Sequence, residues 1–142
     1  GIMSDFAEYA ATNPDAAFSD LPAPIHYDVA IDPFDPNTLY VITLPSGIWI
    51  SHDGGQSWQN SMAGMDPNEP VRQILPDPNR PGLLYVSSGM SGVFYSTDGG
   101  QMWQRLSDGL THSAVYGLAL SSDGSVLYAG TIGGGAFRLG TP

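Results

Sequence analysis

Fourteen acidic side chains and three histidines are the groups in this sequence with the widest chemical range. A pair of carboxylates facing each other across a cleft can hydrolyse a glycosidic bond. Six aspartates are candidates for such a pair: Asp28, Asp32, Asp35, Asp66, Asp77 and Asp108. Most of them stand in Asp-Pro or Asp-Gly dipeptides, where an aspartate ordinarily accepts hydrogen bonds within a turn. Spacing singles out no pair, so we name no catalytic residue.

Metal binding has equally little support in the spacing. His26, His52 and His112 fall in different turns, and no two of them are separated by one helical turn. The run from Asp77 to Gly82 has the outline of a calcium loop, but proline occupies its fifth position and no glutamate completes it. Cysteine is absent, which excludes disulfides, thiolate ligands and a thiol nucleophile. We therefore expect no metal and no cofactor.

The basic side chains are four arginines, and there is no lysine: Arg72, Arg80, Arg105 and Arg138. Converging arginines hold carboxylate substrates, but these four fall in separate strands and turns. The net charge of -10 repels phosphate backbones and anionic lipids, so we expect no nucleic-acid partner. No apolar run is long enough to span a membrane. Cationic partners and divalent ions remain compatible with this charge.

An internal repeat supplies the elements that position these groups. Residues 51–58, SHDGGQSW, return as residues 96–103, STDGGQMW, at an offset of 45. Upstream, Gly47–Ile50 matches Gly92–Tyr95 at the same offset. A third copy begins at Val115 and lacks this motif. The chain thus contains two complete units and most of a third.

Each unit consists of short alternating apolar runs separated by turn-forming residues. In the first unit these runs are residues 27–31, 38–43, 47–51 and 57–61. Period-two alternation between closely spaced turns predicts antiparallel meanders, and four strands in a unit of this length predict a β-propeller blade. We expect an all-β fold of such four-stranded blades, about three per chain. The expected blades are residues 25–68, 69–112 and 113–140.

The N-terminal segment, residues 1–24, departs from the repeat. Asp5 and Glu8 have the spacing of a capping box, which predicts a short helix. Phe18–Leu21 is similar to residues 106–110, which follow a predicted fourth strand. The segment can therefore supply a closing strand as well as the helix.

The repeated motif S-x-D-x-G-x-x-W resembles the Asp-box, or bacterial neuraminidase (BNR) repeat, of propeller blades. Its members here are Ser51, Asp53, Gly54, Gly55 and Trp58, and then Ser96, Asp98, Gly99, Gly100 and Trp103. The aspartate can accept backbone N–H groups across the turn, and the glycines supply positive φ angles. We interpret both boxes as structural. The similar run Ser121–Gly124 lies in the first hairpin of its unit and is not a box.

Residues 25–139 are similar to secreted propeller proteins such as sialidases, xyloglucanases, sortilin-type receptors and the photosystem II assembly factor. This resemblance implies a propeller fold and an extracellular or periplasmic location. A sialidase also needs an arginine triad and a glutamate beside its nucleophile, whereas Glu8 and Glu69 are the only glutamates here. We therefore expect a non-catalytic binding or scaffolding domain for a protein or carbohydrate partner. The alternative is a portion, or a relative, of a propeller glycoside hydrolase.

Two aromatic columns recur with the unit: Tyr40, Tyr85 and Tyr128, and Trp49, Phe94 and Phe137. Exposed aromatic rings can stack on sugars, but packing between neighbouring blades is the commoner use of such a column. Three blades are too few to close a ring. We expect either a homodimer that closes a six-bladed ring or a place within a longer propeller chain.

Overall fold

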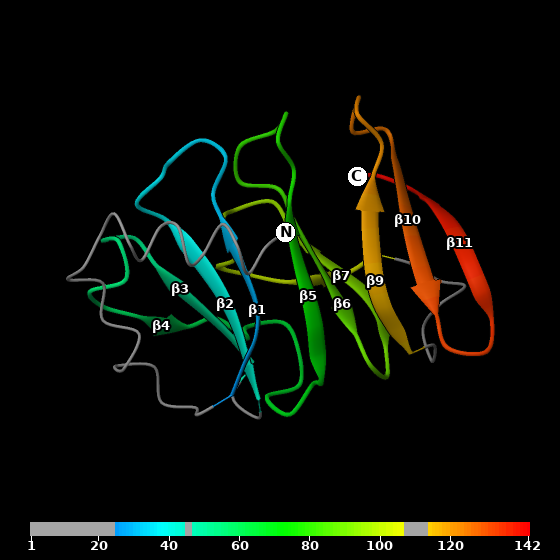
Figure 1. Cartoon of the computed structure of the whole chain (residues 1–142), viewed down its shortest axis with the longest axis horizontal. Helices are drawn as coiled ribbons and strands as arrows, with labels where there is room; N and C mark the ends of the chain where they lie inside the picture. The colour runs from blue at the N-terminus through cyan, green and yellow to red at the C-terminus, as the bar shows by residue number, and fades with distance from the viewer. Residues whose placement is uncertain (1–24, 45–46, 107–113) are drawn as a thin grey trace.

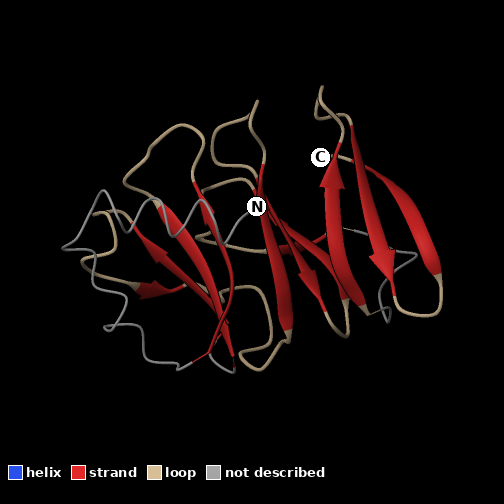
Figure 2. Cartoon of the chain, viewed as in Figure 1, coloured by secondary structure: helices blue, strands red, loops and turns tan. Residues whose placement is uncertain are grey.

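The computed structural model describes residues 25–44, 47–106 and 114–142. These residues form three antiparallel sheets side by side, with no helix among them (Figure 2). No helix in this part is long and apolar enough to cross a bilayer. The predicted N-terminal helix and closing strand lie outside the described residues.

Each sheet is a meander in which successive strands pair (Figure 1). The first sheet contains β1 (Ile25–Ile31), β2 (Leu39–Leu44), β3 (Gly47–Ser51) and β4 (Gln59–Asn60). The second contains β5 (Val71–Pro76), β6 (Leu84–Ser88), β7 (Gly92–Ser96) and β8 (Gln104–Arg105). The third contains β9 (Val115–Leu120), β10 (Val126–Thr131) and β11 (Gly135–Gly140). The all-β prediction, with about three blades, is confirmed.

The fourth strands are shorter than the sequence suggests. The apolar run 57–61 predicts a full strand, whereas β4 contains two exposed residues that pair with Trp49 and Ile50. Trp58 instead belongs to the turn, where its indole donates to the carbonyl of Gly55. Residues that would otherwise extend this strand therefore form part of the Asp-box turn.

Packing between the sheets forms the hydrophobic core. Tyr40, Ile42 and Ile48 of the first sheet lie with Ile74 and Phe94 of the second in one buried cluster. A second cluster joins the opposite face of the second sheet to the third: Leu83, Tyr85, Val93, Val115, Leu118, Leu127 and Ala129. The second sheet thus presents one face to the first sheet and the other face to the third.

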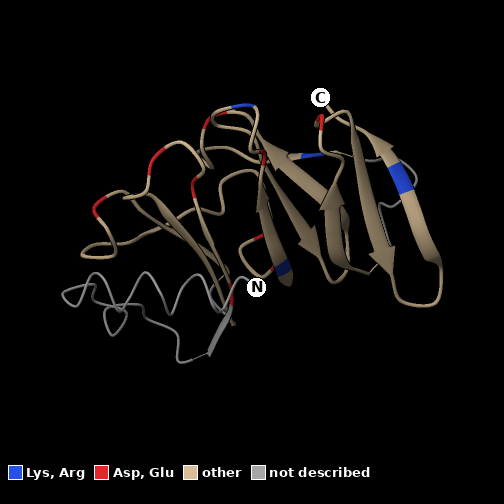
Figure 3. Cartoon of the chain, turned by 45° about the horizontal axis from the view of Figure 1, so that its top comes forward, with Lys and Arg blue, Asp and Glu red and all other residues tan. Residues whose placement is uncertain are grey.

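The antiparallel meander divides the turns between two ends of the molecule. The turns after β1, β3, β5, β7 and β9 lie at one end, which we call the acidic end. Most described carboxylates are there, and Figure 3 shows them as red segments along these turns. They are Asp32, Asp35, Asp53, Asp77, Asp98 and Asp123. The ends of β2, β6 and β10 lie at the opposite end, together with the start of β5.

Candidate functional site

The first Asp-box is held together by hydrogen bonds among its own residues. Ser51 Oγ donates to Asp53 Oδ1 at 2.8 Å and accepts from the Gly55 N–H at 2.8 Å. Asp53 in turn accepts from the backbone and the hydroxyl of Ser57. Gly54 and Gly55 have φ angles of 73° and 91°, which side chains resist. The side chains of Ser51 and Asp53 therefore stabilise the turn of their own box, while the Gly54 N–H donates to the Asn37 carbonyl of the preceding turn.

The second Asp-box repeats this network inside its own turn. Ser96 Oγ donates to Asp98 Oδ1 at 2.7 Å and accepts from the Gly100 N–H at 2.8 Å. Asp98 Oδ1 also accepts from the backbone N–H groups of Gln101 and Met102, at 3.0 and 3.1 Å. Gly99 and Gly100 again have positive φ angles, of 74° and 92°.

The two box tryptophans have different partners. Trp58 Nε1 bonds within its own turn, whereas Trp103 Nε1 donates to the carbonyl of Ser61 in the first sheet's β4–β5 connection, at 2.8 Å. The Trp103 N–H also donates to the carbonyl of Ala63 at 2.9 Å. A Cβ on Gly64 would lie 2.1 Å from the Trp103 carbonyl oxygen. The second box thus also fastens the second sheet to the first, a contact that the repeat pattern alone does not reveal.

The hydrogen bonds of the box also set the acidity of its carboxylate. Donation from the Ser57 hydroxyl, and then from its N–H, lowers the pKa of Asp53 from 3.8 to about 2. A hydrogen bond from the Ser96 hydroxyl likewise lowers the pKa of Asp98. Both carboxylates are therefore anionic turn caps at neutral pH, a state unsuited to a general acid.

The other candidate aspartates also stabilise turns. Asp32 accepts from the Phe34 and Asp35 N–H groups and from the Tyr40 hydroxyl. Asp35 and Asp66 each accept from an N–H two residues on. Buried Asp77 accepts from the Asn79 N–H at 2.7 Å. The structure brings none of these into a two-carboxylate cleft within the described part of the chain, and Asp108 lies outside that part.

Arg80 occupies the loop whose sequence has the outline of a calcium site. Its Nε donates to Asp77 Oδ2 at 3.1 Å, and its terminal nitrogens donate to the carbonyls of Gly124 and Pro142, at 2.9 and 2.7 Å. This arginine ties the second sheet's turn to the third sheet. In the described part of the chain, no three acidic or histidine side chains gather as metal ligands.

Among the histidines, the ring of His52 is the one that the structure places. It is exposed in the variable position of the first box, with Nδ1 3.2 Å from the Thr38 hydroxyl. The His26 side chain and the whole of His112 lie outside the described parts.

Asp28 and Gln73 join neighbouring sheets at the same register position. Asp28 pairs with Ile42 in the first sheet, and Gln73 pairs with Ser87 in the second. Each lies at a β-bulge in the first strand of its own sheet. Asp28 Oδ2 accepts from the Ile74 N–H at 3.0 Å. Burial raises the pKa of this carboxyl.

Gln73 makes a fuller version of the same contact. Its amide oxygen accepts from the Leu118 N–H at 2.8 Å, and its amide nitrogen donates to the Leu118 carbonyl at 3.4 Å. Both side chains therefore act between sheets and not on a substrate.

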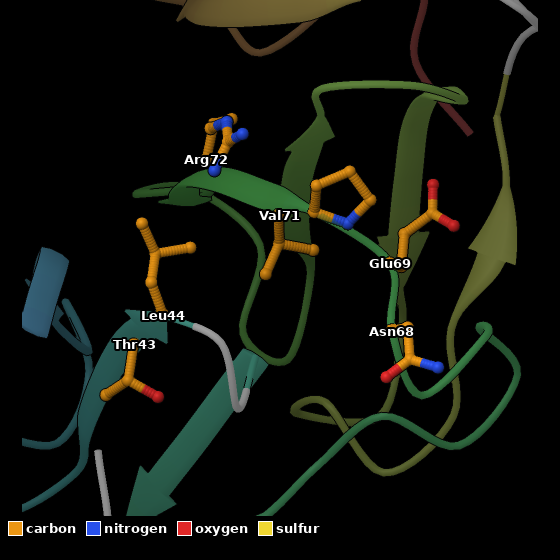
Figure 4. Close-up of a pocket in the computed structure, with 7 residues that line it drawn as sticks. Thr43, Leu44, Asn68, Glu69, Val71 and Arg72 are labelled. Atoms are coloured by element: carbon orange, nitrogen blue, oxygen red, sulfur yellow. The ribbon is translucent and has the colours of Figure 1, made fainter.

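A pocket of about 250 Å³ lies opposite the acidic end, between the first and second sheets (Figure 4). The end of β2 forms one wall, and the β4–β5 connection with the start of β5 forms the other. Its lining residues are Thr43, Leu44, Asn68, Glu69, Pro70, Val71 and Arg72. We call this pocket the groove, and the end of the molecule that contains it the groove end.

The charged side chains of the groove are held in place by neighbouring residues. Glu69 accepts from the Ser88 hydroxyl at 2.5 Å, and the same hydroxyl accepts from the N–H groups of Met90 and Ser91. The Glu69 carboxylate is thus fixed against the β6–β7 turn. Arg72 extends from β5 toward the third sheet, where its guanidinium carbon lies 5.4 Å from the centre of the Tyr116 ring. This distance is typical of a cation–π contact.

Large apolar side chains surround this end of the molecule. Met90 is 66% exposed, Ile132 is 71% exposed and Tyr116 is 38% exposed. Tyr116 lies against the Arg72 guanidinium, and the Ile132 N–H donates to the carbonyl of Ala114, which precedes β9. Apolar side chains at turn tips are unusual, and such patches mark interaction surfaces.

Sequence reasoning did not identify the groove. Its two walls come from different repeats. One wall is the β4–β5 connection, which contains no repeated motif comparable to the Asp-box. Two signals were available: Glu69 is one of two glutamates in the whole chain, and Met90 and Ile132 occupy hairpin-turn positions where polar residues are usual.

One family model matches most of the chain. It is described as Sortilin, neurotensin receptor 3 (Sortilin-Vps10), and it matches residues 12–129. No curated protein sequence matches the chain.

Solved propeller structures resemble the chain in fold. The GH74 enzyme of Niastella koreensis superposes with a TM-score of 0.66 at 22% identity, covering 80% of this chain and 19% of that one. The GH74 xyloglucanase of Xanthomonas campestris gives 0.61 at 19% identity, covering 72% and 18%. YCF48 of Cyanidioschyzon merolae gives 0.63 at 20% identity, covering 84% and 35%. The chain therefore has a propeller-type fold and spans between a fifth and about a third of these relatives' lengths.

Proposed function

This chain belongs to the Sortilin-Vps10 family, and from that premise we propose that it is a non-catalytic binding domain whose partner is a segment of another protein. We place the binding surface at the groove end. The observation that carries the proposal is the combination of the groove with the exposed side chains of Met90, Tyr116 and Ile132.

The chemistry of this surface suits a peptide with apolar anchors. A groove between rigid sheets can accept an extended segment, and exposed methionine adapts to varied apolar side chains. The whole chain carries a net charge of -10, which favours association with basic proteins. We therefore expect a partner segment that combines apolar side chains with lysine or arginine.

Carbohydrate binding and hydrolysis are the competing functions. The chain resembles GH74 enzymes in fold. A glycosidase site could therefore combine one carboxylate of this chain with a second carboxylate from another part of a complete propeller. Against this, Asp32, Asp35, Asp66 and Asp77 are each occupied in turns. An extracellular or periplasmic location, which the family resemblance favours, is part of the same proposal.

Two assays test the proposal. The first incubates the chain with xyloglucan oligosaccharides and with sialosides, and we expect no hydrolysis. Turnover that one aspartate substitution abolishes would instead establish the glycosidase alternative. A glycan array that retains the chain without turnover would show a carbohydrate-binding domain.

The second assay selects peptides that bind the chain from a random peptide library. We expect apolar, basic peptides whose affinity falls at least about tenfold in the Met90→Asp and Ile132→Asp variants. Met102→Asp is the matched control, because Met102 is 49% exposed at the acidic end. Equal loss in the control variant, or no selected peptide, would contradict a binding surface at the groove end.

The assembly of the three sheets is a separate part of the proposal. We expect further sheets to complete the propeller, supplied either by a second copy of this chain or by additional repeats.

A further inference from the structure

Glu69 lies on a part of the groove wall that backbone hydrogen bonds hold in place on both sides. Its N–H donates to the Asp66 carbonyl at 3.0 Å, and its own carbonyl accepts from the Val71 N–H at 2.9 Å. The next carbonyl, that of Pro70, accepts from the Gly89 N–H of the β6–β7 turn at 2.7 Å. A carboxylate on such a segment is oriented before a ligand arrives, so little conformational entropy is lost on binding.

One of the two carboxylate oxygens of Glu69 is already in use. Oε1 accepts from the Ser88 hydroxyl at 2.5 Å. That hydroxyl is itself fixed, because it accepts from the N–H groups of Met90 and Ser91 at 3.0 and 2.9 Å. In the described part of the chain no donor bonds to Oε2. Glu69 thus offers a ligand one fully available oxygen, on a carboxylate of fixed orientation.

Arg72, the other charged side chain of the groove, is directed elsewhere. Its guanidinium carbon lies 5.4 Å from the centre of the Tyr116 ring. Its Nε lies close to the β6–β7 turn, since a Cβ on Gly89 would be 3.2 Å from that nitrogen. The described residues therefore give Glu69 a hydroxyl partner and no direct counter-ion.

The groove also presents aliphatic surface next to this carboxylate. Leu44 extends from the end of β2, and Val71 extends from the start of β5 (Figure 4). Pro70 and Asn68 line the same wall as Glu69. A lysine side chain combines an aliphatic stem with a charged tip, and such stems pack along apolar surface. Its stem can contact Leu44 and Val71 while its ammonium group reaches Glu69.

We propose that Glu69 determines the specificity of the groove by binding the ammonium group of a lysine in the partner segment, in preference to the guanidinium group of an arginine. An arginine fork donates to both oxygens of a carboxylate, whereas Oε1 of Glu69 already accepts from Ser88. An ammonium group needs one oxygen, and its other N–H groups can turn to the Asn68 amide and to water. The inference rests on the proposed function, because it names the side chain that the peptide-binding groove selects.

Three peptides that differ in one side chain test this preference. They are acetyl-leucyl-lysyl-leucinamide and its arginyl and norleucyl counterparts, of which the last keeps an aliphatic stem without a charge. Each is titrated into the 142-residue chain while the methyl NMR signals of Leu44 and Val71 are followed. We expect the lysyl peptide to bind at least about tenfold more tightly than the norleucyl peptide. It should bind at least about threefold more tightly than the arginyl peptide.

The Glu69→Gln variant removes the charge and keeps the size of the side chain. It should weaken binding of the lysyl peptide to the affinity of the norleucyl peptide, and its amide NMR spectrum should show the native fold. Asp66→Asn is the matched control, because it removes the same charge from the same β4–β5 connection at a residue that does not line the groove. It should change the affinity for the lysyl peptide by less than about twofold.

The outcomes separate this inference from the proposed function. A loss of affinity for the lysyl peptide in Glu69→Gln but not in Asp66→Asn supports the proposal. Equal affinities for the lysyl and arginyl peptides, or an equal loss in both variants, overturn it and leave a groove that binds peptides by other contacts. If none of the three peptides shifts the signals of Leu44 and Val71, the groove does not bind such segments, and the proposed function fails together with the inference.

Discussion

At the scale of single residues, each Asp-box depends on a serine that is buried and an aspartate that is exposed. Ser51 and Ser96 are 1% exposed, and each accepts a buried N–H from a glycine four residues on. The carboxylate then orders the outer part of the turn. Loss of the serine leaves a buried donor without a partner, whereas loss of the aspartate is partly compensated by water.

Acid should weaken the first box through Asp53. Its pKa is about 2 in the folded chain, below its ordinary value of 3.8, so the stabilisation is present above the ordinary pKa. It is lost as the pH falls through about 2. We expect the thermal midpoint, measured by calorimetry at a series of pH values, to fall as the pH is lowered from 3.8 to about 2. It should fall less in the Asp53→Asn variant. An identical acid profile for the variant would contradict this role.

Gly64 should tolerate no side chain. Its φ angle is +94°, and a Cβ would meet the Trp103 carbonyl oxygen at 2.1 Å. We expect Gly64→Ala to destabilise the chain by at least about 3 kcal/mol, from backbone strain and overpacking together. Gly133→Ala is the matched control, because Gly133 has a φ of +80° but open space around it. It should cost only about 1 kcal/mol in urea unfolding.

At the scale of strands, the contacts of Asp28 and Gln73 make a natural comparison. Both occupy the same place in the repeat. The Gln73 amide both accepts from and donates to Leu118, whereas the Asp28 carboxylate can only accept across the interface, and it accepts from the Ile74 N–H. The carboxylate also carries a raised pKa, because burial opposes its charge. The first interface therefore contains the less favourable version of this contact at neutral pH.

Asp28→Gln should stabilise the chain at neutral pH. A raised folded pKa means that the contribution of Asp28 is fully present below its unfolded pKa and is lost as the pH rises through the folded value. The gain from Asp28→Gln should consequently grow as the pH rises above 3.8, the ordinary pKa of this carboxyl. Chemical unfolding at several pH values measures it. Gln73→Asp should show the opposite trend, and equal effects at all pH values would argue against titration of Asp28.

Sequence periodicity was sufficient for the first three strands of each sheet, because these depend on local contacts, but it made the fourth strand of the first sheet too long. Asp-Gly turns, positive-φ glycines and alternating apolar residues act within one repeat. The different partners of Trp58 and Trp103 were not predictable in the same way, since they depend on which segment of a neighbouring sheet is within reach. The groove was missed for the same reason: its two walls come from different repeats.

The exposure of Tyr128 is a further case. Its position in the repeat predicts burial between blades, as found for Tyr40 and Tyr85. A repeat pattern identifies the packing face of a sheet but not whether a neighbour covers it. The single-sequence prediction thus describes the blade correctly and leaves the neighbour unspecified.

At the scale of the whole molecule, charge is distributed unevenly between the two ends. The acidic end contains most described carboxylates, and Arg80 bonds one of them. Each carboxylate is satisfied locally, but their mutual repulsion remains. This repulsion is screened within a Debye length of about 10 Å at 0.1 M salt.

Added salt should therefore stabilise the chain. We expect the thermal midpoint to rise between about 10 and 150 mM sodium chloride, because screening relieves repulsion at the acidic end. Calcium chloride at matched ionic strength is the control. An equal rise indicates screening alone, whereas a larger rise with calcium would reveal a specific cation site. A midpoint that does not move with salt would contradict the repulsion.

The positions of the three tryptophans determine what an optical experiment can observe in this protein. Trp49 and Trp58 belong to the first sheet, and Trp103 joins the second sheet to it. The third sheet contains no tryptophan between Val115 and Gly140. Indole fluorescence therefore reports on the first sheet and, through Trp103, on its interface with the second sheet, but not on the interface between the second and third sheets. If the third sheet separates first on heating, the emission spectrum stays native while tyrosine signals change, and a single-wavelength melt overstates the cooperativity of the molecule.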